Sequence, residues 1–234
     1  MILRYGLIAA LALFCAACSA PTPSALERAA LGQTELGQSE LGQSELGGAT
    51  LPPGAAEAVF AGGCFWCIEH DFEDLPGVIE AVSGYTGGAL QNPTYQDVIT
   101  ETTGHYEAVR VVYDPQIVSY EALLGYFWRR VDPTDAGGQF CDRGPSYRTA
   151  IFVTETQRAA AEASRAALEA SAVLPGPVMT TVLPLEVFWV AEDYHQDYAK
   201  KNPVRYRFYR TSCGRDARVA AVWANAPASP QGEP

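Results

Sequence analysis

The stretch Gly62-Gly63-Cys64-Phe65-Trp66-Cys67-Ile68-Glu69 decides how the chain is interpreted. Residues 57–61 before it are typical of a short strand, and residues 65–74 after it contain no helix breaker before Leu75-Pro76-Gly77. The two glycines therefore mark a strand-to-helix turn, with Cys64 at the helix N-terminus. Free backbone N–H groups and the helix dipole stabilise an anion there, so we expect a lowered thiol pKa and a reactive thiolate. The alternative is a small buried cysteine followed by two aromatic core residues.

Strands and helices are predicted to alternate along the chain, with long irregular loops between them. The predicted strands cover residues 57–61, 78–85, 107–113, 149–153 and 178–183. The predicted helices cover residues 65–74, 95–100, 119–131, 154–172 and 191–200. This pattern indicates an α+β fold, a mixed β-sheet with helices packed on it. No Gly-x-Gly-x-x-Gly turn is present, which excludes a Rossmann dinucleotide site.

One acidic residue lies on the apolar side of a predicted strand. In the strand 107–113, Glu107 shares a face with Val109, Val111 and Tyr113 because side chains alternate with period two. We expect this face to bury the carboxyl group and raise its pKa. The alternative is a glutamate at the end of the strand that stays in solvent.

Composition limits the class of protein. The chain has 234 residues, 48% of them hydrophobic, which is enough for one domain with a real core. Its formal net charge is -11, and residues 51–234 carry 23 acidic and 14 basic residues. No cluster of Lys and Arg could neutralise a run of phosphates, so nucleic acid is not expected as a partner. We expect a monomer.

The first twenty residues are interpreted as an export signal. Arg4 precedes an apolar run at residues 6–17, which is too short to cross a bilayer. Small residues around Cys18 allow two cleavage sites. Cleavage before Cys18 would give a lipidated cysteine and membrane attachment, which we favour although Cys15 stands where such signals usually have leucine; cleavage after Ala20 would release the protein. Either route predicts an exported, periplasmic protein.

The rest of the chain is divided by composition. Residues 21–50 are predicted to be a low-complexity flexible linker, because 31–45 hold three copies of a Leu-Gly-Gln-Thr/Ser-Glu pentad that cannot build a core. Residues 51–216 are predicted to form the catalytic domain, and residues 217–234 a C-terminal tail that frays.

Four cysteines remain for the domain, namely Cys64, Cys67, Cys141 and Cys213. Four cysteines are too few to stabilise so large a domain through disulfides, so we interpret them as redox-active or catalytic residues rather than structural ones. Three alternatives stay open: ordinary structural disulfides, a general thiol–disulfide oxidoreductase using Cys64-x-x-Cys67, and a zinc site made from all four thiolates.

Seven ordered motifs resemble the type A family of peptide-methionine (S)-S-oxide reductases, over about residues 57–215. The motifs are Gly62-Gly63-Cys64-Phe65-Trp66, Ser83-Gly84-Tyr85-Thr86-Gly87-Gly88, Asn92-Pro93-Thr94-Tyr95, Thr103-Gly104-His105-Tyr106-Glu107-Ala108-Val109, Phe140-Cys141-Asp142-Arg143-Gly144, Tyr147-Arg148 and Tyr194-His195-Gln196-Asp197-Tyr198. The resemblance implies a ferredoxin-like core and the reduction of methionine-S-sulfoxide, in proteins and as the free amino acid.

The resemblance also implies a role for each matched residue near the sulfoxide. The Cys64 thiolate would attack the sulfoxide sulfur while Glu107, as a neutral acid, protonates the oxygen. Tyr95 and Tyr147 would donate hydrogen bonds to the same oxygen.

Three further matched residues would bind the substrate. Phe65 and Trp66 would form an apolar pocket for the S-methyl group. Asp142 would bind the substrate backbone. His105 and His195 are interpreted as structural, because their spacing does not favour a Cys-His hydrolase.

Attack leaves a sulfenic acid on Cys64, which a second thiol must resolve. Cys213, expected in a flexible tail after Asn202-Pro203, resembles the family's resolving cysteine and is favoured. It departs from the two-cysteine, Gly-rich tail of many members. Cys67, one helical turn from Cys64, is the alternative, and Cys141 is interpreted as a buried thiol.

The implied chemistry needs no bound cofactor and no metal. An external thioredoxin-like dithiol would reduce the disulfide, using reducing equivalents carried across the membrane. The expected partners are therefore oxidised proteins, free methionine sulfoxide and that dithiol protein.

Overall fold

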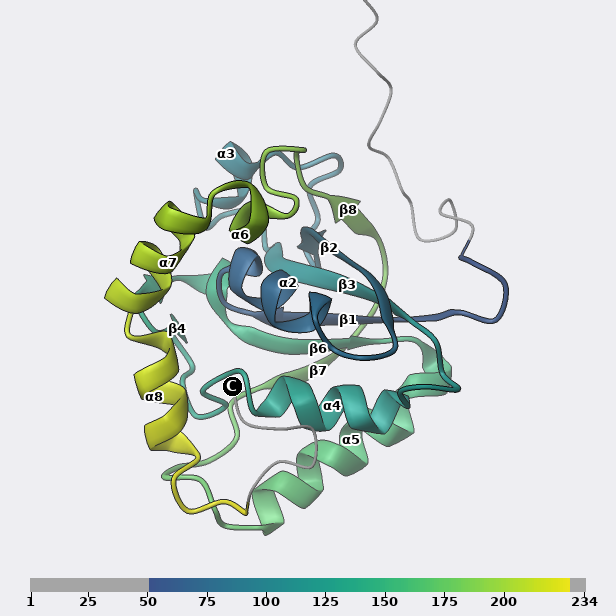
Figure 1. Cartoon of the computed structure of the whole chain (residues 1–234), viewed down its shortest axis with the longest axis vertical. Helices are drawn as coiled ribbons and strands as arrows, with labels where there is room; N and C mark the ends of the chain where they lie inside the picture. The colour runs from purple at the N-terminus through teal and green to yellow at the C-terminus, as the bar shows by residue number, and fades with distance from the viewer. Residues whose placement is uncertain (1–50, 228–234) are drawn as a thin grey trace, which may run out of the picture. The chain divides into compact units, whose positions relative to one another are not determined.

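The computed structural model describes residues 51–227 of the chain. These residues fold around a six-stranded mixed sheet (Figure 1). The strand order is β7-β6-β1-β3-β2-β8, and all neighbours are antiparallel except β6 and β7. The strands are β1 (Ala56–Gly62), β2 (Val78–Thr86), β3 (Tyr106–Tyr113), β6 (Thr149–Val153), β7 (Thr181–Pro184) and β8 (Phe188–Val190). A small second sheet pairs β4 (Gly138–Gln139) with β5 (Asp142–Arg143). The predicted α+β mixed sheet is confirmed.

Helices cover one face of the sheet and line its edge. They are α2 (Phe65–Glu73), α3 (Tyr95–Val98), α4 (Tyr120–Trp128), the 3₁₀ helix η1 (Pro145–Tyr147), α5 (Glu155–Ala170), α6 (Tyr198–Lys201), α7 (Pro203–Ser212) and α8 (Arg215–Val222). Along β1, Phe60 belongs to the main core with α2 and α4, whereas Val59 belongs to a smaller cluster that includes Phe188. The alternation follows from the period-two geometry of a strand. The ring of Phe60 stacks on Phe72 of α2 and Phe127 of α4, at 5.1 and 5.0 Å, and each such buried side chain contributes roughly 1.5–3 kcal/mol.

The turn from β1 into α2 requires its glycines. Gly63 has φ +83°, a conformation that L side chains rarely adopt, and a Cβ there would lie 2.6 Å from the Cβ of Gln139. Gln139 cannot give way, because it is fully buried and its side chain bonds the backbone N–H and C=O of Asp132. The sequence signal at residues 62–64 therefore corresponds to a sharp turn packed tightly against the β4 segment.

The prediction of a flexible tail after Pro203 is wrong. The chain there forms α7 and α8, which follow one another along one side of the sheet (Figure 1). Helix α8 continues past residue 216, with Val219, Val222 and Trp223 buried in the main core. The indole N–H of Trp223 donates to the carbonyl of Val131 at 3.1 Å. The spacing of these apolar residues was the helical signal that the interpretation missed.

The predicted helix over residues 191–200 is also largely wrong. Only its last turn is helical, as α6. Asp197 adopts a left-handed conformation with φ +52°, so a helix that began before Asp197 could not continue through it. Residues 191–197 instead form turns that carry His195 beside α2, and β8 precedes them as a strand that the sequence pattern did not predict.

Among residues 51–227, no helix has both the length and the apolar character needed to cross a bilayer. The predicted export signal, Cys18 and the linker 21–50 lie outside the described residues, as do residues 228–234.

Candidate active site

Cys64 lies at the first turn of α2, where the sequence predicted it, and only 6% of the residue is exposed. The first backbone N–H of the helix, that of Phe65, donates to Glu107 Oε2 at 3.0 Å. The amide N–H of Cys67 donates to the Cys64 carbonyl. The helix N-terminus is therefore capped by a carboxyl group from the neighbouring strand, and its first N–H is not available to the Cys64 sulfur.

Glu107 lies on β3 directly opposite Tyr85 of β2 and is 2% exposed. Burial raises its pKa to about 8, while the hydrogen bond from the Phe65 N–H opposes the shift and the negative charge of Asp142 adds to it. At pH 7 the carboxyl group is therefore mostly protonated. The burial and the raised pKa agree with what the apolar strand face predicted.

The predicted lowering of the Cys64 pKa is wrong for the resting protein. Burial raises the pKa of Cys64 well above its ordinary value, and its hydrogen bond to Cys67 raises it further. The pKa of Cys67 is lowered, mainly because Cys64 donates that hydrogen bond and also because the charge of Arg215 lies near. The two thiols titrate as a pair. Cys64 holds the shared proton, and the first negative charge of the pair lies on Cys67.

Two tyrosines that the sequence selected reach the same site from separate loops. Tyr95 opens α3, and its backbone N–H donates to Glu192 Oε1 at 2.9 Å. Tyr147 ends η1, which Glu101 fixes by accepting bonds from the N–H and hydroxyl of Ser146 at 2.8 and 2.7 Å. Burial, and after it the negative charge of Glu107, raise the pKa of both tyrosines. Both phenols thus remain neutral hydrogen-bond donors near Glu107.

Aromatic side chains form one wall of the site. The ring of Trp66 stacks on Tyr198, with centroids 3.7 Å apart, and its indole N–H donates to His195 Nδ1 at 3.0 Å. The ring of Phe65 is fully buried and lies 4.9 Å from that of His195. Burial lowers the pKa of His195 to about 4, so the imidazole is neutral and its Nδ1 accepts the bond. His195 therefore orients Trp66, in agreement with its interpretation as structural.

Tyr209 of α7 is a site residue that sequence reasoning missed. Its hydroxyl donates to Asp142 Oδ2, and its side chain packs against the buried pair Cys64 and Cys67. Burial raises the pKa of Asp142, and the bond from Tyr209 partly offsets this. Tyr209 carries no motif of its own, because it stands in a run rich in Tyr and Arg. Glu192, which holds Tyr95 and accepts from the hydroxyl of Tyr85, was also missed; it stands just before the matched motif at residues 194–198.

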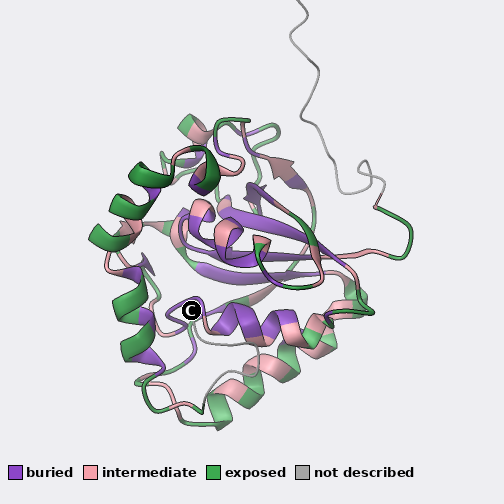
Figure 2. Ribbon diagram, in the orientation of Figure 1, coloured by how far each residue is buried: buried purple, intermediate pink, exposed green. Residues whose placement is uncertain are grey.

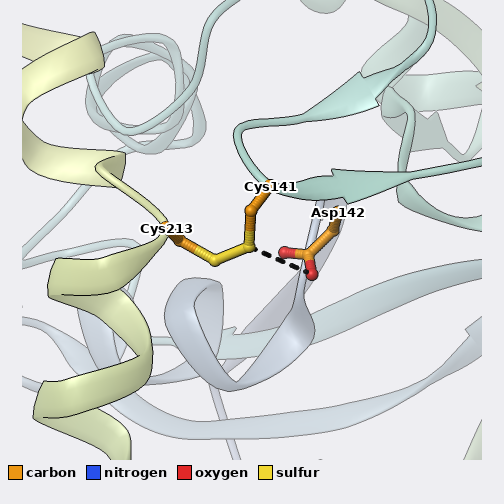
Figure 3. A group of neighbouring side chains, drawn as sticks. All are labelled: Cys141, Asp142 and Cys213. Carbon is orange, nitrogen blue, oxygen red and sulfur yellow. Dashed lines mark hydrogen bonds between the residues drawn. A yellow bond between two sulfur atoms is a disulfide. The ribbon is translucent and has the colours of Figure 1, made fainter.

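Cys213 is bonded to Cys141 in this structure (Figure 3). The two Cα atoms lie 4.9 Å apart, within the usual range for a disulfide. The interpretation of Cys141 as a buried thiol is wrong, because the residue is exposed. Cys213, which the sequence favoured as the resolving thiol, has no free sulfur in this state. The cysteine in contact with Cys64 is the alternative, Cys67.

The four cysteines therefore form two pairs. Cys64 and Cys67 are reduced and buried, whereas Cys141 and Cys213 join the loop that carries Asp142 to the end of α7. This division does not provide the four-thiolate set that the zinc alternative requires.

Two cavities, of about 430 and 490 Å³, lie elsewhere. The first is lined by charged residues of α2 and α6 that include Glu69 and Lys200, and the second borders Cys213 and Arg218. Neither is lined by Cys64 or Glu107, so the chemistry of the side chains, not cavity size, identifies the active site.

The arrangement suits one class of reaction. A thiol lies beside a neutral carboxylic acid, two phenol hydroxyls and an apolar aromatic wall. Such a set can attack an electrophilic atom while an oxygen bound to that atom leaves with a proton.

Comparison with known proteins points to the same chemistry. The family model described as peptide methionine sulfoxide reductase matches residues 56–227. Peptide methionine sulfoxide reductase MsrA 2 of Caulobacter vibrioides is 59% identical over 180 residues, which is 75% of this chain and 91% of that protein. MsrA of Bacillus subtilis is 51% identical over 167 residues, 71% of this chain and 94% of that protein.

Solved structures show the same fold. Methionine sulfoxide reductase A of Corynebacterium diphtheriae superposes with a TM-score of 0.59 at 34% identity, covering 65% of this chain and 77% of that one. Reduced Mxr1 of Saccharomyces cerevisiae gives a TM-score of 0.61 at 26% identity, covering 67% of this chain and 90% of that one. The family match spans most of the chain and includes the Cys64 turn, Glu107 and both site tyrosines. The chain therefore belongs to the type A peptide methionine sulfoxide reductases, a family of oxidoreductases.

Proposed function

We propose that this protein reduces methionine-S-sulfoxide to methionine, both in proteins and as the free amino acid. The observation that carries the proposal is the contact between the first turn of α2, where Cys64 lies, and a buried Glu107 whose pKa is about 8. A sulfoxide sulfur becomes electrophilic when its oxygen is protonated, and this acid is neutral at pH 7. The S-epimer preference comes from the family resemblance.

The first step transfers the oxygen. Cys64 passes its proton along the hydrogen bond to Cys67, and the resulting thiolate attacks the sulfoxide sulfur while Glu107 protonates the oxygen. The sulfur–oxygen bond breaks, the hydroxyl passes to the Cys64 sulfur, and the new bond between the two sulfurs breaks, so that methionine leaves and Cys64 becomes a sulfenic acid. The sulfoxide sulfur gains two electrons and the Cys64 sulfur loses two.

Tyr95 and Tyr147 support this step by donating hydrogen bonds to the oxygen as negative charge develops on it. Phe65 and Trp66 hold the S-methyl group, a role supported by their place in the aromatic wall. Asp142 binds the substrate backbone. This role is supported by its half-buried position and by the hydrogen bond that it accepts from Tyr209. Burial raises its pKa.

The second step closes a disulfide. The Cys67 thiol attacks the sulfenic sulfur of Cys64, a bond forms between the two sulfurs, and the hydroxyl leaves as water with the thiol proton. Two observations support Cys67: it lies one helical turn from Cys64 in the same buried cluster, and Cys213 is already bonded to Cys141. The Cys141–Cys213 bond meanwhile holds the Asp142 loop against α7.

An external dithiol of the thioredoxin type would then reduce the Cys64–Cys67 disulfide and return both thiols. We further propose that the protein acts as a monomer in the periplasm, attached to a membrane through a lipidated Cys18. These proposals rest on residues 1–50 and on the family resemblance. Mass spectrometry of the mature N-terminus, in the natural chain and in Cys18→Ala, tests the lipidation of Cys18.

A general thiol–disulfide oxidoreductase built on Cys64 and Cys67 is the second candidate, favoured by the reduced pair in one helical turn. One assay separates the two: purified protein is given methionine sulfoxide and dithiothreitol, and methionine is measured. The reductase forms methionine and loses this activity in Cys64→Ser, whereas Glu121→Gln, at an exposed position on α4, serves as the control. An exchanger forms none.

A further inference from the structure

The outer face of α7 exposes two large apolar side chains. Val204 is 82% exposed and Phe208 74% exposed, and they lie one helical turn apart on the same side. Arg205 and Arg207 flank them, also exposed. We name these four residues the α7 outer face. Figure 2 shows the helix exposed along its outward turns, beside the buried residues of the sheet and α2.

The opposite side of α7 belongs to the active site. Tyr206 is buried with Cys64 and Cys67, and Tyr209 bonds Asp142 and packs against the same two thiols. One helix therefore separates the α7 outer face from the reacting thiol. Tyr209 of this helix bonds Asp142, which is proposed to bind the substrate backbone, so a polypeptide held by Asp142 would lie near α7.

The charge of the α7 outer face is opposite to that of the chain as a whole. The chain has a net charge of -11, yet Arg205 and Arg207 both lie on this helix. Within residues 51–227 neither arginine forms an ion pair, whereas Lys200 and Lys201 just before them pair with acidic side chains. Two unpaired guanidinium groups beside a phenyl ring attract a segment that carries both carboxylates and apolar side chains.

We propose that the α7 outer face binds the substrate polypeptide beside its oxidised methionine, and that it selects stretches with an apolar side chain and a carboxylate there. The inference rests on the proposed function, and it names the class of protein substrate. The spacing follows from geometry. An α-helix with its side chains is about 10–12 Å across, and an extended chain advances about 3.3 Å per residue. The selected residues therefore lie about three to four positions from the methionine sulfoxide.

The test compares peptides with the free amino acid, using dithiothreitol as reductant. Three peptides carry one methionine sulfoxide, a leucine three positions away, and Asp, Asn or Lys four positions away. The variants are Phe208→Ser and the double variant Arg205→Glu/Arg207→Glu. The controls are Ile117→Ser, at an exposed apolar residue between β3 and α4, and Arg158→Glu, at a half-exposed arginine of α5.

Each arm has a defined expectation. Phe208→Ser lowers kcat/KM for all three peptides about fivefold and leaves free methionine sulfoxide within twofold of the natural chain. The double variant lowers kcat/KM for the Asp peptide about tenfold, which corresponds to about 1.4 kcal/mol, and raises it for the Lys peptide. Salt at 0.5 M removes most of this charge effect because it screens exposed pairs. The two control variants change neither substrate.

Several outcomes would overturn the inference. If the variants lowered kcat/KM equally for peptides and for free methionine sulfoxide, α7 would only support the structure of the active site and would not bind the polypeptide. No loss on any peptide would show that the outer face does not bind substrate. Losses seen only when a thioredoxin-like protein replaces dithiothreitol would assign this face to the reductant. Failure of the natural chain to reduce free methionine sulfoxide would instead refute the proposed function itself.

Discussion

Replacing Glu107 with glutamine removes the proton donor of the proposed reaction while keeping the size of the side chain. The amide oxygen can still accept the Phe65 N–H bond that caps α2. A positioned general acid contributes about 10²–10⁴-fold to a rate. We therefore expect Glu107→Gln to lower kcat/KM for methionine sulfoxide by about that factor, with the fold and the Cys64 thiol intact.

The pH dependence follows from the raised pKa. With a pKa of about 8, Glu107 is about ten-elevenths protonated at pH 7 and about one-eleventh at pH 9. The rate should therefore fall about tenfold over these two units and continue to fall above pH 9. On the acid side of the profile the rate should fall as the Cys64–Cys67 pair becomes fully protonated, because Cys67 can then no longer accept the Cys64 proton. In Glu107→Gln the alkaline fall should disappear.

Stability should change with pH in a defined direction. Between the ordinary pKa of 4.5 and about 8, the folded protein keeps a proton on Glu107 that the unfolded chain has released. The contribution is therefore fully present below pH 4.5 and is lost as pH rises through 8, by at most roughly 5 kcal/mol. The difference in unfolding free energy between Glu107→Gln and the natural chain should therefore shift in favour of the variant from pH 5 to pH 9. Urea unfolding at the two pH values measures this difference.

The assay measures methionine formed from free methionine sulfoxide with dithiothreitol between pH 5 and 10, with Glu121→Gln as the surface control. A Glu107→Gln variant that keeps activity within threefold of the natural chain, or that retains the alkaline fall, would refute the assignment of Glu107 as the acid.

Further predictions concern three neighbouring residues. Cys67→Ser should release one methionine per chain without reductant but form no disulfide at residue 64. Peptide mapping of the natural chain after one turnover should give a Cys64–Cys67 bond. A Cys64–Cys213 bond would contradict this. Tyr147→Phe should lower kcat/KM about tenfold or more without changing the circular dichroism spectrum, and an unchanged rate would remove the phenol from the oxygen site. Gly63→Ala should destabilise the fold by about 2 kcal/mol or more, because of its positive φ and the 2.6 Å approach to Gln139, so an unaltered urea midpoint would be inconsistent with the turn.

Local patterns predicted much of the sheet and the centre of the site. The Gly62-Gly63 signal gave the turn that carries Cys64, because positive φ and close packing leave few alternatives to glycine. The period-two pattern of β3 gave the burial of Glu107, because it depends only on which face of the strand is apolar. Both features are encoded within about ten residues of chain.

Features that depend on distant segments were not predictable. Burial raises the pKa of Cys64, and Tyr206 of α7 packs with both thiols. No local rule places that helix. Cys141 and Cys213 are 72 residues apart, and sequence alone does not give the connectivity of a cysteine pair. Helix α8 was missed because its many alanines and exposed residues obscured the stripe that Trp223 completes.

The most direct test of the central claim traps the oxidised sulfur. Cys67→Ser is mixed with one equivalent of methionine sulfoxide in the presence of dimedone and without reductant, and the chain is mapped by mass spectrometry. The account predicts one methionine per chain, formed more slowly than in the natural chain because serine cannot take the Cys64 proton, and a dimedone adduct on Cys64 with the Cys141–Cys213 bond intact. Methionine formed with no adduct on Cys64, or formed equally by Cys64→Ser, would contradict it.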